Sequence, residues 1–158
     1  MRIAVLGAGR IGKIHGLNVA SRPGVKLVAV ADPNRPSAEA LASATGAEVR
    51  DVDSVIECAD VDAVIIGAPT TTHADFIERA ARAGKAIFCE KPVDLSSARI
   101  QACLDVVKTC GVPLMIGFTA VLIRASPSWN GVCAPAPSAR SRSSPSSRAI
   151  PIHRRPAT

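Results

Sequence analysis

The sequence predicts an α/β fold in which helices cover both faces of a doubly wound parallel sheet. Short aliphatic runs alternate with stretches of helical length over residues 1–118, and glycine or proline stands at most of their ends. Aromatic residues make up only 3% of the chain, so the core must be aliphatic, as in a sheet buried on both faces. We expect one domain over residues 1–118, because residues 119–158 differ sharply in composition.

The first thirty-two residues predict a strand, a glycine turn, a helix, a second strand and an acidic residue. A short apolar run ends in Gly-Ala-Gly-Arg-Ile-Gly, a GxGxxG pattern formed by Gly7, Gly9 and Gly12. A second apolar run, residues 25–31, stops at Asp32, twenty residues after Gly12. This order and spacing are typical of a Rossmann-type dinucleotide-binding fold.

Each residue type in this motif suits a bound dinucleotide. Gly7 lets the chain turn off the strand, Gly9 lets the backbone approach a pyrophosphate, and Gly12 lets the helix pack on the sheet. The helix then begins with Arg10 and Ile11, whose N–H groups lie at the positive end of its dipole. The acid after the second strand can accept hydrogen bonds from ribose hydroxyls. We therefore predict NAD as the cofactor, with a chance glycine turn as the alternative.

The remaining elements follow from helix stops and caps. Glycines end three helical patterns, and we expect Thr72 and either Ser96 or Ser97 to be N-caps. We expect five helices. The first follows the glycine turn and ends near residue 21, the next two cover residues 37–45 and 53–58, and the last two begin at the caps and end at residues 83 and 109. The predicted strands cover 2–6, 25–31, 47–49, 63–66, 86–89 and 113–118.

Three segments that follow predicted strands should meet at one edge, because the carboxyl ends of parallel strands lie together. They are residues 7–12, 69–73 and 90–92. Lys91, in the third segment, could hydrogen-bond a substrate hydroxyl and favour its deprotonated form. A solvated surface lysine is the alternative, and position alone does not separate the two.

Four stretches carry a resemblance to a known family: GAGRIGKIH, VAVADPN, PTTTHADFIERAARAGKAIFCEKPVDLS and PLMIGF. They resemble the glucose–fructose oxidoreductase/inositol dehydrogenase family, Gfo/Idh/MocA, over residues 1–118. The stretch AGKAIFCEKPVDL is especially similar to myo-inositol 2-dehydrogenases. The EKP motif, with P-T-x-x-H upstream, is more specific than the glycine turn.

The resemblance implies hydride transfer between a polyol or sugar hydroxyl, with myo-inositol favoured, and a nicotinamide cofactor. It implies that Lys91 is catalytic and that Glu90 and Pro92 shape its turn. Asp32 favours NAD, although Arg35 could accommodate the 2′-phosphate of NADP, so both cofactors stay open. The other residues that the resemblance places in the cofactor crevice are Ala68, Pro69, Thr70 and His73.

Two histidines each have a functional and a structural interpretation. His15 would lie near the nicotinamide in such enzymes, but an ordinary position on a helix face fits equally well. For His73, packing at a helix N-terminus is favoured over chemistry. Full-length members form homo-oligomers and carry a second, antiparallel domain that binds substrate and supplies an Asp and a His, and nothing here corresponds to it.

Residues 119–158 hold eight Ser, six Pro, six Arg and no acidic residue, which is typical of disorder. Family members usually continue after GF with a sequence like NRRFDPSF. Restoring one base before the Thr119 codon permits Asn-Arg-Arg-Phe-Asp-Pro-Ser and later Gly-Glu-Ile-Glu-Ile-Val in one frame. We therefore interpret residues 119–158 as an out-of-frame tail, and expect this truncated chain to bind a dinucleotide weakly with little turnover.

Charge and cysteine usage argue against other functions. The net charge of +6 lies wholly in residues 119–158, where Trp129 is the only aromatic residue, so we expect no nucleic-acid partner. The five Cys and three His show no metal-ligand spacing, so no metal site is expected. We find no membrane-length apolar run and no signal peptide, and expect a cytoplasmic protein. The alternative function is a non-catalytic dinucleotide-binding module.

Overall fold

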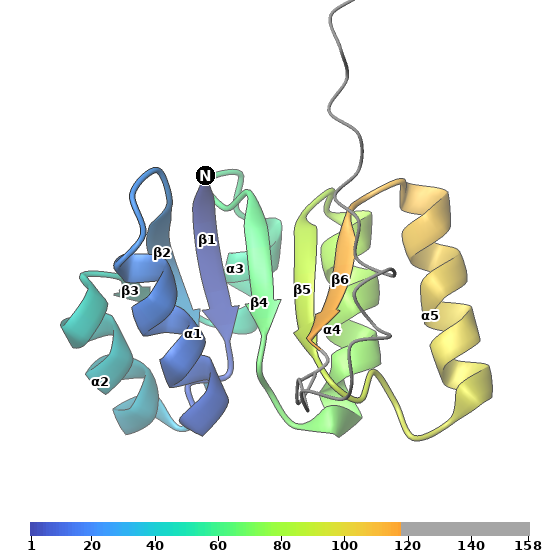
Figure 1. The fold of residues 1–158 in the computed structure, drawn as a ribbon, viewed down its shortest axis with the longest axis horizontal. Coiled ribbons are helices and arrows are strands. Elements are labelled where there is room, and N and C mark those ends of the chain that lie inside the picture. The colour runs from blue at the N-terminus through green and yellow to red at the C-terminus, as the bar shows by residue number, and fades with distance from the viewer. Residues whose placement is uncertain (118–158) are drawn as a thin grey trace, which may run out of the picture. The chain divides into compact units, whose positions relative to one another are not determined.

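A computed structural model describes residues 1–117 of the chain. These residues form one six-stranded parallel sheet with helices on both faces, which confirms the predicted fold class (Figure 1). The predicted tail, residues 119–158, lies outside the described residues, as does Phe118 at the end of the last predicted strand.

The sheet consists of β1 (Arg2–Leu6), β2 (Lys26–Ala31), β3 (Glu48–Val49), β4 (Ala63–Ile66), β5 (Ala86–Glu90) and β6 (Leu114–Gly117). Their order in space is β3-β2-β1-β4-β5-β6, and every neighbouring pair is parallel. The chain therefore winds outward from β1 in one direction, then returns and winds in the other. The point of reversal, between β1 and β4, is where doubly wound sheets bind their ligands.

The helices are α1 (Arg10–Ala20), α2 (Arg35–Thr45), α3 (Val52–Glu57), α4 (Thr70–Arg82) and α5 (Ser97–Cys110). Helices α1 and α2 pack on one face of the sheet and the other three on the opposite face. Ser96, one of the two residues considered, caps α5. The prediction that Thr72 caps α4 is wrong, because that helix already begins at Thr70 and the Thr72 hydroxyl donates to the Pro69 carbonyl at 2.8 Å.

The core is aliphatic on both sides of the sheet. Leu6, Ile66 and Ile77 are completely buried in the layer under α3, α4 and α5. On the other side, Leu27 and Leu41 are 2% and 1% exposed under α1 and α2. Each such side chain contributes about 1.5–3 kcal/mol on burial, so the two layers make a rigid support for the loops at the sheet's edge.

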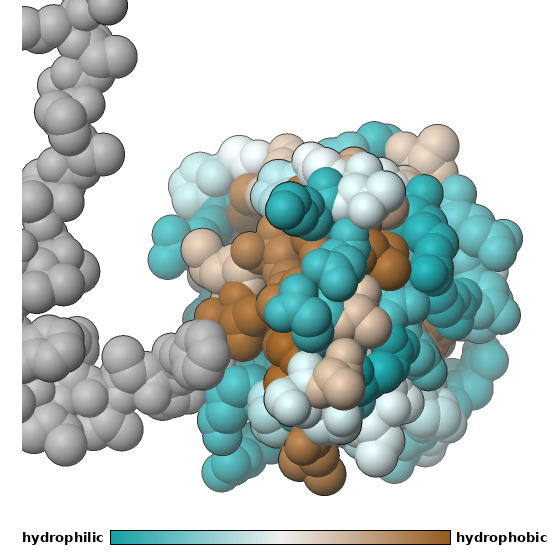
Figure 2. Space-filling view, turned by 90° about the vertical axis from the view of Figure 1, so that its right-hand side faces the viewer, coloured by the Kyte–Doolittle hydropathy of each residue, from teal (hydrophilic) through white to brown (hydrophobic). Residues whose placement is uncertain are grey.

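One side of the sheet carries exposed apolar side chains. Met115 on β6 is 66% exposed, and it is in register with Phe88 of β5, which is only partly buried. Figure 2 views the molecule from this end of the sheet and shows apolar surface beside hydrophilic side chains. Surface of this kind is common where a protein contacts another domain or chain.

Candidate functional site

The glycine turn after β1 needs glycine at two positions. Gly7 has a φ of +100°, and a Cβ there would lie 2.7 Å from backbone atoms of Gly67 and Ala68. A Cβ on Gly12 would lie 1.7 Å from the carbonyl oxygen of Gly7. The turn, the start of α1 and the end of β4 are therefore packed backbone to backbone, and no larger residue fits there.

Gly9 has a different surrounding. Its φ is −66°, and a Cβ there would meet nothing within 4 Å. The packing of the protein itself therefore does not require glycine at this position. Open space beside the backbone is what the close approach of a pyrophosphate needs, so the turn fits a dinucleotide.

The N-termini of α1 and α4 both lack a side-chain cap. Their N-cap residues, Gly9 and Pro69, make no capping hydrogen bond, and neither first turn holds an acidic residue. By contrast, Asn34, Asp51 and Ser96 cap the other three helices with their side chains. Uncapped helix N-termini keep N–H groups for an anion. Because β1 and β4 are neighbours, these two helices begin at the same edge of the sheet.

Asp32 closes β2 beside the glycine turn. Its Oδ2 accepts the Ala8 N–H at 2.5 Å, and its Oδ1 accepts the Asn34 N–H at 2.7 Å. Each carboxylate oxygen keeps a further lone pair, so the group is held in place and can still accept from ribose hydroxyls. Arg35 lies on the exposed side of α2, where its Nε donates to Glu39 at 2.9 Å.

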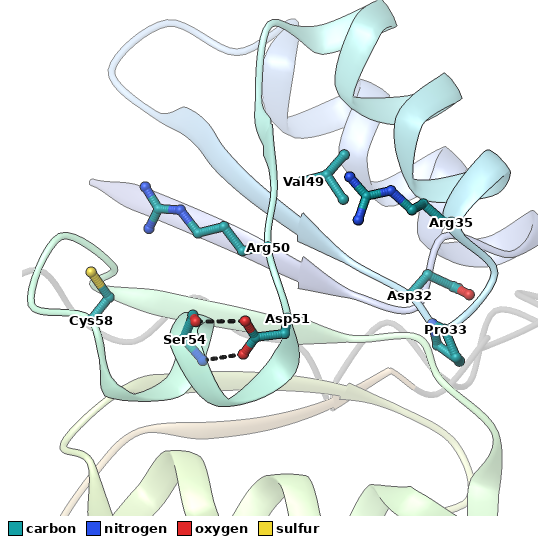
Figure 3. Close-up of a pocket in the computed structure, with 8 residues that line it drawn as sticks. All are labelled: Asp32, Pro33, Arg35, Val49, Arg50, Asp51, Ser54 and Cys58. Carbon is teal, nitrogen blue, oxygen red and sulfur yellow. Dashed lines mark hydrogen bonds between the residues drawn. The ribbon is translucent and has the colours of Figure 1, made fainter.

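A pocket of about 630 Å³ opens next to Asp32 (Figure 3). Its volume is in the range of small-molecule pockets. The Ser54 backbone and hydroxyl both donate to the Asp51 carboxylate, which lowers the pKa of Asp51 and fixes this wall. The residues that line the pocket are Asp32, Pro33, Arg35, Val49, Arg50, Asp51, Ser54 and Cys58.

The sequence did not reveal the wall of this pocket that β3 and α3 form. Arg50 lines it, and its guanidinium is bound to Glu48 and Asp60 at 2.7 and 2.8 Å. The same ion pair holds the pKa of Asp60 well below its usual range. The acid-rich spacing around Arg50 was the one available signal, but it predicts an ordinary surface ion pair as readily as a pocket.

The segment after β5 presents Lys91 at the same edge. Lys91 is exposed and forms no ion pair with any residue between 1 and 117, so its ammonium group stays available for a ligand. A cis peptide bond joins it to Pro92. The structure therefore brings together all three predicted segments, the glycine turn, residues 69–73 and residues 90–92, at the carboxyl edge.

The His15 side chain reaches from α1 to the end of β5. Its Nε2 lies 2.7 Å from Oε1 of Glu90, with the two side chains 22% and 15% exposed. Its ring also meets the Phe88 ring edge-on, with centroids 5.1 Å apart. A Cβ on Gly117 would lie 2.7 Å from the Phe88 ring and 3.2 Å from the Glu90 carboxylate, so glycine in β6 leaves room for both.

His73 lies inside the protein, 2% exposed, between two turns of the edge. Its Nδ1 is 2.7 Å from the Pro92 carbonyl oxygen, and its Nε2 is 2.7 Å from the Ala68 carbonyl oxygen. Carbonyl oxygens only accept, so both contacts are hydrogen bonds when each ring nitrogen carries a proton. His73 thus ties the turn after β4 to the turn that holds Lys91.

Other kinds of site find no support in residues 1–117. No group of three or more His, Cys, Asp or Glu side chains there could hold a metal ion. The four cysteines of this region are unpaired, and burial raises the pKa of the Cys89 thiol to about 12. None of the helices described is both long and apolar enough to cross a membrane.

Comparison with known proteins gives a family match over the described domain. Residues 1–118 match the family model GFO_IDH_MocA, described as an oxidoreductase family with an NAD-binding Rossmann fold. An inositol 2-dehydrogenase of Rhizobium meliloti is 56% identical over 118 residues, which are 75% of this chain and 36% of that protein. A scyllo-inositol 2-dehydrogenase (NAD(+)) of Bacillus subtilis is 47% identical over 121 residues, 75% of this chain and 35% of that protein.

A solved structure of similar fold holds bound ligands. It is scyllo-inositol dehydrogenase from Lactobacillus casei with NAD(H) and scyllo-inositol, with a TM-score of 0.70 and 33% identity. The match covers 74% of this chain and 36% of that one. This chain therefore spans about a third of the length of the relatives that it matches.

Proposed function

This chain belongs to the Gfo/Idh/MocA oxidoreductases, and from that membership we propose that it binds NAD at the carboxyl edge of its sheet. The observation that carries the proposal is that α1 and α4, which follow the neighbouring strands β1 and β4, both begin at this edge without side-chain caps. Gly9, the N-cap residue of α1, has open space beside its backbone. The two helix ends and the open backbone suit the two phosphates of a dinucleotide.

The other residues of the edge take complementary roles in this proposal. The Asp32 carboxylate, held by two backbone N–H groups, accepts from the adenine ribose, and the adjoining pocket takes the adenosine half. A bound nicotinamide supplies the two-electron oxidising chemistry. The Lys91 ammonium would donate a hydrogen bond to the oxygen of the substrate hydroxyl and stabilise negative charge that develops there.

The proposed substrate is a polyol, with an inositol favoured over other sugars. The support is the identity to inositol dehydrogenases over the stretch that contains Lys91. NAD is favoured over NADP, because the Asp32 carboxylate would repel a 2′-phosphate and Arg35 is already paired with Glu39. Assembly into a homo-oligomer and a cytoplasmic location stay proposals that rest on the family.

Isothermal titration of the 158-residue chain with NAD⁺ and NADP⁺ tests the cofactor proposal. We expect NAD⁺ to bind and NADP⁺ to bind at least about tenfold more weakly, a difference of about 1.4 kcal/mol. No heat from either dinucleotide would contradict the proposal. Inositol-dependent NADH formation separates a dehydrogenase from a non-catalytic binding module. We expect this chain to show little, because the Asp and the His that the family resemblance assigns to a second domain are not among the residues 1–117 that form this edge.

The out-of-frame interpretation of residues 119–158 stays a prediction. Sequencing the gene across the codons for Phe118 and Thr119 tests it. A restored base would give the family-like continuation, and NADH formation by that longer protein would then be the relevant assay. If resequencing returns the same bases, a sequencing error is not the origin of residues 119–158.

A further inference from the structure

The two neighbours of Lys91 in the chain are each bound by a histidine. Glu90, before it, is bound through its side chain by His15, and Pro92, after it, is bound through its carbonyl oxygen by His73. The two histidines come from α1 and α4, the helices whose N-termini flank the glycine turn and the β4–α4 turn. Both phosphate-facing helices therefore also hold the turn that carries Lys91.

The contact on the α1 side is built for a specific partner. His15 and Glu90 are 75 residues apart, and their 2.7 Å contact is shielded to 22% and 15% exposure. The Phe88 ring supports the imidazole from one side, and Gly117 of β6 leaves the space that the carboxylate occupies. Because Glu90 contacts His15, one oxygen of its carboxylate is already engaged by a side chain of α1.

The contact on the α4 side is made by the buried His73 ring, which has two partners. His73 holds Pro92 and, through its other nitrogen, the Ala68 carbonyl of the cofactor turn. The distance between the β4–α4 turn and the Lys91 turn is thereby set by one rigid ring. A long, exposed side chain such as Lys91 has no packing of its own to fix it, so its position depends on where its backbone is held.

We propose that His15 and His73 are positioning residues that hold the Lys91 turn from its two sides and place its ammonium group over the bound cofactor. The inference rests on the proposed function, since it assigns a purpose to Lys91 within the dinucleotide site. Catalytic groups must be held to within about 0.5 Å by neighbours whose own conformations are fixed. The two histidines meet that requirement for a residue that the described domain otherwise leaves exposed.

Site-resolved acetylation of the full 158-residue chain, with and without saturating NAD⁺, tests this placement. In the wild-type protein we expect NAD⁺ to slow labelling of Lys91 by about fivefold or more while Lys108, on the far side of α5, is unchanged. His15→Gln keeps one N–H donor for Glu90 and should retain this protection. His15→Leu removes the donor, and His73→Gln reaches only one of two carbonyls, so both should lose most of it.

Circular dichroism and titration with NAD⁺ establish first that each variant is folded and saturated. Equal protection of Lys91 in wild type, His15→Gln and His15→Leu would overturn the positioning role while leaving the cofactor proposal intact. Absence of NAD⁺ binding in the wild type would overturn both. If His73→Gln does not fold, the comparison of His15→Leu with His15→Gln decides alone. A purely structural role of His15 would lower the stability of His15→Leu but would leave Lys91 protected from acetylation once the variant is saturated with NAD⁺.

Discussion

Alanine at Gly9 and alanine at Gly12 should differ in their effect on stability, although both change one hydrogen to a methyl group and both should weaken NAD⁺ binding. At Gly12 the new Cβ would lie 1.7 Å from the Gly7 carbonyl oxygen, whereas real Cβ contacts essentially never fall under 3.0 Å. The turn and α1 must therefore separate by about 1 Å or more, which overpacking data put at about 1–3 kcal/mol. Binding of NAD⁺ is lost with the geometry of the turn.

At Gly9 the new Cβ meets nothing within 4 Å, and the backbone already has a φ of −66°. Stability should be unchanged or rise by about 0.4–1 kcal/mol, because alanine restricts the unfolded chain. The methyl group instead occupies the space where the pyrophosphate approaches. We expect NAD⁺ affinity to fall at least about tenfold, or about 1.4 kcal/mol.

Urea unfolding followed by circular dichroism and isothermal titration with NAD⁺ measure the two effects separately. Each variant serves as the control for the other, since they lie on the same turn. Wild-type NAD⁺ affinity in Gly9→Ala would refute the placement of the pyrophosphate. Wild-type stability in Gly12→Ala would refute the close packing of the turn on α1.

Two further predictions concern groups away from the phosphates. Arg2 lowers the pKa of Asp62 to about 2, below its usual value of about 4, so this pair should stabilise the fold above about pH 4 and cease to do so as the pH falls through about 2. The urea midpoints of wild type and Asp62→Asn should therefore converge at low pH, and a constant difference would contradict the pairing. The buried Lys85 ammonium donates to the carbonyl oxygens of Cys58 and Val61 at 2.6 and 2.8 Å, and Lys85→Met leaves both without this donor. The substitution should lower the free energy of unfolding in urea by about 1–3 kcal/mol, and an unchanged midpoint would argue against these bonds.

The sequence predicted the fold because each local signal there agrees with the sheet that forms. Gly12 packs against the Gly7 carbonyl five positions earlier, and the twenty-residue interval to Asp32 spans most of α1 and all of β2, so both signals depend on residues nearby in the chain. The predicted ends of most elements lie within two residues of those observed. At α4 the prediction chose Thr72 as the cap, since a threonine is a good cap, whereas the chain begins the helix directly after Pro69.

The contacts that join distant segments could not be predicted in the same way. The choice between a helix-face residue and a functional residue at His15 depends on Glu90, 75 positions away, and on a glycine in β6 that makes room. The pocket likewise combines residues that follow β2 and β3 with residues of α3. Such features depend on how several elements pack together, so the local sequence of one element does not reveal them.

An amide NMR spectrum of the chain during titration with NAD⁺ locates the dinucleotide residue by residue. We predict that the shifted signals belong to the carboxyl edge, including Gly9, Asp32 and Lys91. Gly84 and Gly111, which precede β5 and β6 at the opposite edge, should stay unchanged. Shifts that gather at that opposite edge, or a spectrum that NAD⁺ leaves unaltered, would contradict this prediction.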